Sequence, residues 1–119
     1  MALSNINRQI AATHATLGQY KVDVMAARIR DINPQARVTC MPVFYTVEDA
    51  PKYRLSEYDC IVDAIDTVSA KIELIARAAQ AGVPIVSAMG CGNRLDATKF
   101  VVTDLYKTQN DPLARVLRR

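Results

Sequence analysis

The chain has 119 residues, half of them hydrophobic, and a formal charge of +3 from 15 basic and 12 acidic residues. This length suits one domain, so we expect a single domain over residues 1–119. No uncharged apolar run reaches the roughly 18 residues of a membrane span, and the first residues lack the basic flank and apolar core of a signal peptide. We therefore expect a soluble, cytoplasmic protein without a membrane partner.

In chain order, the first predicted element is a helix over residues 17–33. Its apolar residues share one helical face: Val22, Met25, Ile29 and Ile32. The helix should end at Asn33, because the residue before a proline disfavours the helical conformation. Residues 36–44 are rich in β-branched and apolar types and predict a short strand. Residues 48–55 are ambiguous and are compatible with one helical turn.

Residues 58–66 have an apolar centre closed by acidic residues, which is typical of a strand buried on both faces of a sheet. The next helix is expected to start with Thr67 as N-cap and to end at Gly82. Its predicted inner face consists of Val68, Ile72, Ile75 and Ala79. Residues 83–89 then predict a second buried strand, so this segment reads as a parallel crossover unit.

A turn at residues 90–92, a strand over residues 99–107 and a helix beginning at Asp111, with Pro112 in its first turn, complete the predicted order. Helices that alternate with strands in this way indicate an α/β fold. We expect a parallel or mixed sheet with helices on both sides.

Two carboxylates, Asp63 and Asp66, stand where the first buried strand leaves the sheet. Ligands of open parallel sheets bind outside the carboxyl ends of the strands, and paired carboxylates there suit a magnesium ion held with phosphate. The alternative is that Asp66 caps the following helix and Asp63 is solvated. Position alone slightly favours this alternative.

Near the start of the chain, Asn5, Arg8 and Lys21 are candidates for binding polyphosphate. An arginine fork and a lysine point charge complement each other around phosphate, and an asparagine amide can add a donor. Taken singly, each is better explained as a solvated surface residue.

The three cysteines are odd in number and form no Cys-x-x-Cys pair, which argues against a zinc knuckle or a disulfide framework. Cys40 and Cys60 lie in apolar patterns and are expected to be inert core residues. Cys91 lies between two glycines, where it is either a reactive thiol beside Arg94 or simply a small residue in a tight turn. His14 is the only histidine and is weak evidence for a catalytic base.

Four segments together resemble the ThiF/MoeB/HesA adenylating superfamily, the bacterial relatives of ubiquitin-activating enzymes. These segments are LSNINRQ, GQYKVDVMAARIRDINP, YDCIVDAIDTVSAK and GVPIVSAMG. Two further segments, AMGCGNRLDATKF and YKTQNDPLARVLRR, are most similar to the TcdA branch, the tRNA threonylcarbamoyladenosine dehydratases. The resemblance implies a Rossmann-like three-layer sandwich with a mostly parallel sheet.

The resemblance also implies roles for the candidate residues. Arg8 and Lys21 match positions that contact ATP phosphates, Asn5 belongs to the same nucleotide pocket, and Asp66 matches the carboxylate that holds magnesium. Arg8 and Asp66 are therefore the expected catalytic residues, with ATP and magnesium as cofactors. The implied reaction is attack of a substrate carboxylate on the α-phosphate, which gives an acyl-adenylate. In the dehydratase branch the carboxylate belongs to threonylcarbamoyladenosine in tRNA, and closure to a cyclic form follows.

The chain also departs from the superfamily pattern. The glycine-rich loop and its preceding strand should come before SNINRQ, and the pattern continues beyond the final helix. The resemblance thus implies an incomplete domain, truncated at both ends, without useful ATP affinity of its own. Cys91 stands where the dehydratase branch often has a small residue, so no catalytic cysteine is assigned.

Two other interpretations remain open. The superfamily generally dimerises, so a homodimer is expected, and the chain could instead be a non-catalytic dimerising module. A sulfur-carrier or ubiquitin-like protein is the expected partner if the chain belongs to another branch. A third interpretation, a dinucleotide-binding domain of a dehydrogenase, has less support, because the glycine fingerprint of such domains is missing.

Overall fold

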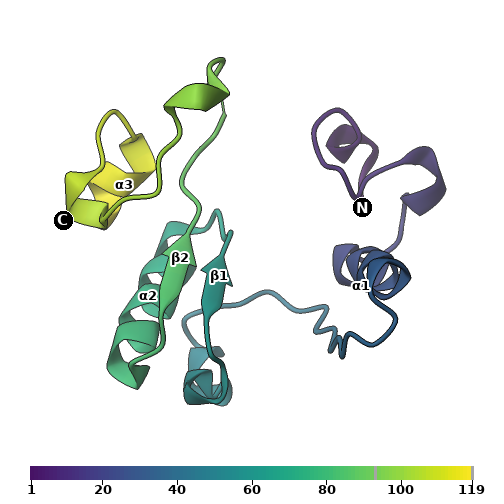
Figure 1. Ribbon diagram of the computed structural model, residues 1–119, viewed down its shortest axis with the longest axis horizontal. Coiled ribbons are helices and arrows are strands. Elements are labelled where there is room, and N and C mark those ends of the chain that lie inside the picture. The colour runs from purple at the N-terminus through teal and green to yellow at the C-terminus, as the bar shows by residue number, and fades with distance from the viewer. Residues whose placement is uncertain (93, 119) are drawn as a thin grey trace. The chain divides into compact units, whose positions relative to one another are not determined.

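The computed structural model describes residues 1–92 and 94–118, which divide into two compact units, Met1–Phe44 and Tyr45–Arg119. We call these the N-terminal and C-terminal units. The N-terminal unit contains two 3₁₀ turns, η1 (Leu3–Asn5) and η2 (His14–Thr16), followed by helix α1 (Lys21–Ile32) (Figure 1). The expectation of one domain over residues 1–119 stays a prediction.

Helix α1 confirms the first predicted helix, although it begins four residues later than expected. Gly18 has a positive φ of 78°, and Tyr20 at the N-cap is extended, so the backbone is not helical before residue 21. The helix ends where the sequence predicted, at Asn33, whose backbone N–H donates to the carbonyl of Ile29. Ala26 is its buried residue, while Ile32 on the predicted apolar face is exposed.

The strand predicted over residues 36–44 is wrong. These residues are extended or bent and pair with no strand among the described residues, and Phe44 is 91% exposed. A β-branched, apolar segment becomes a strand only when a neighbouring strand accepts its hydrogen bonds and packs its side chains.

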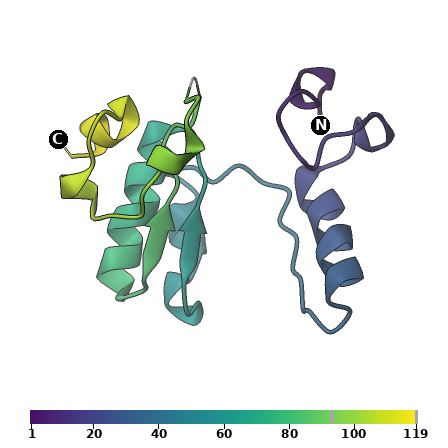
Figure 2. The same cartoon turned by 45° about the horizontal axis from the view of Figure 1, so that its top comes forward.

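The C-terminal unit is built around strand β1 (Ile61–Asp63), helix α2 (Val68–Ala81) and strand β2 (Ile85–Ser87). The two strands are parallel, with Ile61 opposite Ile85 and Asp63 opposite Ser87. Figure 2 shows α2 lying along the pair of strands. This arrangement confirms the predicted parallel crossover unit.

Shorter elements complete the C-terminal unit. The 3₁₀ turns η3 (Ala50–Lys52) and η4 (Leu55–Glu57) precede β1, and η5 (Ala97–Lys99), η6 (Leu105–Lys107) and helix α3 (Pro112–Leu117) follow β2. Helix α2 contacts η4, both strands and α3, so it is the central element of the unit. Leu55, Leu74 and Ala78 form the core cluster, and Ile61 and Ile85 pack against it.

The buried face of α2 differs from the predicted one. The buried residues of the helix are Ala70, Lys71, Leu74 and Ala78, whereas Ile72 on the predicted inner face is 45% exposed. The helix is therefore rotated so that a lysine, rather than a further isoleucine, enters the interior. The prediction from apolar periodicity was wrong for this face, because that method treats every charged residue as exposed.

The sheet is covered less completely than expected. Val62 and Val86, at alternate positions to the core residues Ile61 and Ile85, remain exposed. The predicted burial of β1 on both faces is therefore wrong for the C-terminal unit as described.

The strand predicted over residues 99–107 is also wrong, because the segment contains the last residue of η5 and the whole of η6, with exposed Val101 and Val102 between them. Helix α3 is confirmed, with Pro112 in its first turn. None of the helices in the described parts of the chain has the length and apolar character of a membrane span.

Candidate functional site

Asp63, the last residue of β1, is fully buried, and its side chain and carbonyl both make polar contacts. Its carboxylate Oδ2 lies 2.6 Å from Nζ of Lys71 on α2, and the lysine is fully buried as well. Its Oδ1 accepts a hydrogen bond of 2.9 Å from the backbone N–H of Ile65. Its backbone carbonyl accepts from the N–H of Ala88, just beyond β2, at 2.8 Å.

These contacts correct both sequence-based interpretations of Asp63. Both carboxylate oxygens are engaged within the protein, so Asp63 is not the second of two carboxylates facing a ligand. It is also not solvated. A buried carboxylate is tolerated here because a buried ammonium group and a backbone N–H satisfy it.

Asp66 lies three residues further along the chain and is exposed. It directly precedes Thr67, the N-cap of α2, and no side chain caps that helix. The alternative in which Asp66 caps α2 is therefore not observed. Asp66 presents an exposed carboxylate at the carboxyl end of β1, where ligands of parallel sheets bind.

This carboxylate fits the requirements of magnesium better than those of a metal held by protein side chains alone. Among residues 1–92 and 94–118, no three His, Cys, Asp or Glu side chains gather closely enough to hold a metal ion. Magnesium usually keeps several waters and takes one or two carboxylates together with phosphate oxygens. A single exposed aspartate is consistent with such a phosphate-assisted site.

Asn5 and Arg8 lie together on the tightly turned segment that begins with η1. The N–H groups of Arg8 and Gln9 both donate to the carbonyl of Asn5, and Oδ1 of Asn5 accepts from the N–H of Ala2 at 3.1 Å. Nη1 of Arg8 donates to the carbonyl of Ser4 at 2.6 Å and to Oδ1 of Asn7 at 3.1 Å. Both hydrogen bonds use Nη1 of the Arg8 guanidinium group, and the side chain remains exposed.

Lys21 is the first residue of α1 and is also exposed. Tyr20 at the N-cap makes no side-chain hydrogen bond to the first N–H groups of the helix. A helix N-terminus carries partial positive charge, so Lys21 adds a full charge to a region that already favours anions.

The structure brings Asn5 and Arg8 onto one short segment and places Lys21 in the same unit, at the start of α1. Asp66 belongs to the C-terminal unit, so it is placed by β1 and α2. The roles of these four residues stay predictions.

Lys71 is the residue of this region that the sequence analysis missed. One signal was available: Lys71 precedes Leu74 by three residues and Ala78 by seven, which is the spacing of one helical face. A lysine on the same face as core residues, eight positions after an aspartate that ends a buried strand, indicates a buried ion pair.

Cys91 is exposed, as the sequence suggested, but the side chain of Arg94 binds other residues. Nη2 of Arg94 donates to the carbonyl of Asn110 at 2.6 Å and lies 3.8 Å from Oδ2 of Asp111. Oδ1 of Asp111 in turn accepts from the N–H of Ala114 and caps α3. The arginine thus links the turn after β2 to the start of α3.

The other cysteines differ from expectation. Cys60 is exposed and Cys40 is only half-buried, with its Sγ 3.5 Å from the carbonyl of Val22. The prediction that both are core residues is wrong, because β1 begins after Cys60 and residues 36–44 form no strand.

Comparison with known proteins places these features in a family. The ThiF family pattern matches residues 1–117. The tRNA threonylcarbamoyladenosine dehydratase of Bacillus subtilis (strain 168) is 41% identical over 98% of this chain, and that of Escherichia coli (strain K12) is 43% identical over 99%. The molybdopterin-synthase adenylyltransferase of E. coli is 32% identical over the whole chain.

Solved structures agree with the sequence matches. The crystal structure of the E. coli dehydratase TcdA in complex with ATP superposes with a TM-score of 0.94 at 43% identity, and the match covers 99% of this chain and 49% of that one. The chain covers 46% of the B. subtilis relative and 44% of the E. coli relative, so it spans about half the length of the curated relatives it matches. The likeness confirms the predicted Rossmann-like α/β fold. The chain belongs to the ThiF family.

Proposed function

We propose that this chain takes part in ATP-dependent adenylation of a carboxylate, and that the carboxylate belongs to threonylcarbamoyladenosine in tRNA. One observation carries the proposal: nearly all of the chain superposes, at 43% identity, on a tRNA threonylcarbamoyladenosine dehydratase that was solved in complex with ATP. Because the chain spans about half of that relative, the activity, the tRNA substrate and the cofactors all belong to the proposal.

The exposed cations have the chemistry that such a reaction requires. Arg8 and Lys21 contact the ATP phosphates, and the side-chain amide of Asn5 adds a donor beside Arg8. A planar guanidinium group can hold two phosphate oxygens at once, whereas a lysine ammonium acts as a point charge. Together they offset the repulsion between an anionic substrate carboxylate and the anionic phosphates.

Asp66 holds the magnesium ion in this proposal. When bound, the ion neutralises charge that builds up on the phosphates during the reaction. Asp63 is excluded as a ligand, because its two oxygens bind Lys71 and the N–H of Ile65.

The reaction is an in-line displacement at the α-phosphorus. A carboxylate oxygen of the substrate forms a bond to the α-phosphorus, while the bond from that phosphorus to the bridging oxygen breaks and pyrophosphate leaves. The product is an acyl-adenylate. Ring closure of the threonylcarbamoyl group then releases AMP, so the modified nucleoside loses one water overall.

A different acceptor is the second candidate. A sulfur carrier protein adenylyltransferase of Thermus thermophilus is 34% identical over 71% of the chain, but the identities to the tRNA-modifying relatives from B. subtilis and E. coli are higher over nearly the whole chain. We therefore favour tRNA over a sulfur-carrier protein. Cytoplasmic localisation and a homodimer form part of the same proposal.

A chimeric enzyme tests the function despite the partial coverage. The segment of the E. coli dehydratase that matches this chain, 118 aligned residues, is replaced by this chain. We expect the chimera to form the cyclised nucleoside in tRNA when ATP and magnesium are supplied. Arg8→Ala and Asp66→Ala should abolish product formation.

Matched controls come from the same units. Arg28 and Asp59 are exposed, and Arg28→Ala and Asp59→Ala should leave product formation unchanged. Full activity of Arg8→Ala and Asp66→Ala would contradict the assigned roles. A folded chimera that binds ATP but adenylates only a sulfur-carrier protein would favour the second candidate.

A further inference from the structure

We propose that Asp63, held in the interior by its ion pair with Lys71, is a positioning residue whose side-chain oxygen fixes the loop carrying Asp66. The inference rests on the proposed function for the role of Asp66. The part concerning the loop rests on contacts that the structure shows.

The burial of this pair is unusual for the C-terminal unit. Asp63 and Lys71 are the largest fully buried side chains among the described residues, and both are completely inaccessible to solvent. The apolar residues buried with them are mostly small: Ala50, Leu55, Ala70, Leu74, Ala78, Val83 and Ala114. A buried ion pair costs desolvation energy that its attraction does not always offset, so stability alone is a weak reason to place one here.

The pair joins three parts of the unit at one point. Lys71 lies in the first turns of α2, and its backbone N–H donates to the carbonyl of Thr67. Asp63 ends β1, and its carbonyl accepts from Ala88 beyond β2. The side-chain contact of 2.6 Å therefore connects the carboxyl ends of both strands to the start of α2.

The second carboxylate oxygen of Asp63 binds the backbone of the loop that follows β1. Oδ1 accepts from the N–H of Ile65 at 2.9 Å, which fixes the backbone two residues after the strand. The side chain of Ile65 also packs against the core cluster of Leu55, Leu74 and Ala78. Asp66 is the next residue, and it is exposed, so the direction of its carboxylate depends on the backbone just before it.

Two double variants separate positioning from stability. Asp63→Asn with Lys71→Met removes both charges but keeps a side-chain oxygen that can accept from Ile65. Asp63→Leu with Lys71→Met removes both charges and that oxygen. Neither variant buries an unpaired charge, and replacing a buried ion pair by apolar side chains of similar volume often preserves the fold.

The first readout is hydrogen exchange of the Ile65 amide, measured on the unmodified chain and its variants without nucleotide. We expect exchange to accelerate by about tenfold or more in the Asp63→Leu double variant and to stay within about threefold in the Asp63→Asn double variant. Thermal melting of each variant shows that the unit remains folded.

The second readout is ATP affinity of the chimera described above, with and without magnesium. The Asp63→Leu double variant should lose about tenfold in affinity with magnesium and little without it, because only the metal-dependent part uses Asp66. A matched control, Arg54→Met with Glu57→Leu, removes an exposed ion pair of 3.6 Å from the same unit and should change neither readout.

Each outcome decides the inference. Equal exchange at Ile65 in the two double variants, or equal magnesium-dependent affinity, would overturn it. If the unmodified chimera binds no ATP, the proposed function fails, and the exchange of Ile65 alone decides whether the side-chain oxygen of Asp63 holds the loop. A general loss of stability that affects all amides of α2 alike would show a structural role only.

Discussion

Two aspartates three residues apart have opposite environments. Asp63 is fully buried against Lys71, whereas Asp66 is exposed at the carboxyl end of β1. The sequence predicted that both lie at the end of a strand. Which carboxylate faces solvent depends on how the strand packs against α2, and this packing cannot be read from the spacing of the two aspartates. Only the exposed one is free to bind a ligand.

Tyr45 gives a prediction about a buried hydroxyl. Among the described residues its hydroxyl oxygen is buried and has no hydrogen-bond partner. Tyr45→Phe removes a polar group that lost its water on folding, so the free energy of unfolding should rise by about 1 kcal/mol. Urea denaturation measures the change. Tyr58→Phe, at a residue that is half exposed, is the control and should change stability by less than about 0.5 kcal/mol.

The same residue predicts a pH dependence. Burial is the main cause that raises the pKa of Tyr45, with Glu73 acting in the same direction and Arg77 opposing it. The unfolded state therefore releases the Tyr45 proton at a lower pH than the folded state. As a result, the contribution of this pKa difference to the free energy of unfolding is fully present below the unfolded pKa of about 10 and is lost as pH rises through the folded pKa. Stability measured between pH 9 and about 11 should fall less in Tyr45→Phe than in the parent. Parallel curves would contradict this.

At the scale of elements, the end of α2 depends on one glycine. Gly82 has φ of 68°, and its N–H donates to the carbonyls of Ala78 and Ala79. Gly82→Ala should destabilise the unit by about 1 kcal/mol, because a side chain is strained in this conformation although no atom would clash with it. Gly90→Ala, where φ is not positive and space is also open, is the matched control for denaturation measurements. Equal stability of the two variants would show that the left-handed conformation is not required.

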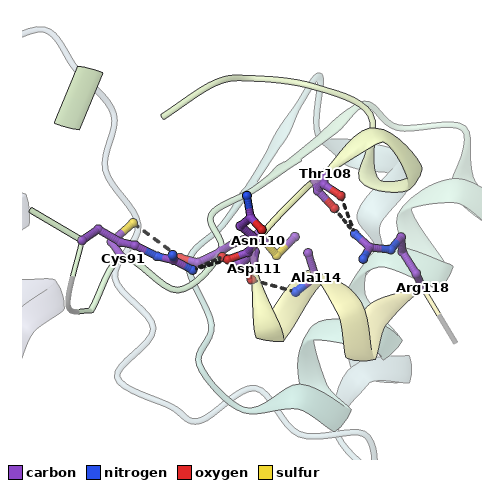
Figure 3. Close-up of polar contacts among 8 residues, drawn as sticks. Cys91, Thr108, Asn110, Asp111, Ala114 and Arg118 are labelled. Carbon is purple, nitrogen blue, oxygen red and sulfur yellow. Dashed lines mark hydrogen bonds and ion pairs between the residues drawn. The ribbon is translucent and has the colours of Figure 1, made fainter. Parts of the chain in front are cut away.

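Helix α3 depends on its cap. Oδ1 of Asp111 accepts from the N–H of Ala114 at 2.8 Å (Figure 3), so Asp111→Ala should cost about 1 kcal/mol of stability. Asp111→Asn keeps an accepting oxygen and loses only the charge that lies 3.8 Å from Arg94. It should retain most of the stability in chemical denaturation. A loss as large as that of the alanine variant would assign the effect to the ion pair.

The sequence predicts the helices better than the strands. Helices α1, α2 and α3 lie where periodicity, caps and prolines indicated, because these signals are local. The strands predicted over residues 36–44 and 99–107 are absent from the described structure, because strand formation requires a partner that composition does not reveal. Strands β1 and β2 form because α2 returns the chain so that they pair.

In the candidate site, too, features with local sequence signals were predicted and features that depend on distant contacts were not. The positions of Arg8, Lys21 and Asp66 at a turn, a helix start and a strand end follow from local patterns and the family resemblance. The pairing of Asp63 with Lys71 was missed, because it depends on how α2 is rotated against the sheet. That rotation is set by packing with Leu55 and Ile85, which are distant in sequence.

At the scale of the whole molecule, the buried pair predicts non-additive stability. Lys71→Met alone leaves the buried carboxylate of Asp63 without its cation and should lower the free energy of unfolding by about 3 to 5 kcal/mol. Adding Asp63→Leu should restore much of this loss, because no unpaired charge remains. A double-mutant cycle in urea measures the coupling. Additive losses would show that the two side chains do not act as a pair.

We propose that this chain supplies catalytic residues for adenylation of a carboxylate. ATP–pyrophosphate exchange by the chimera, with tRNA bearing threonylcarbamoyladenosine as the carboxylate substrate, tests this proposal. Under this proposal we expect exchange that requires this tRNA and falls by about 100-fold or more in Asp66→Asn, with Asp59→Asn unchanged. Exchange that persists at the parent rate in Asp66→Asn, or that is absent from a folded, ATP-binding chimera, would contradict it.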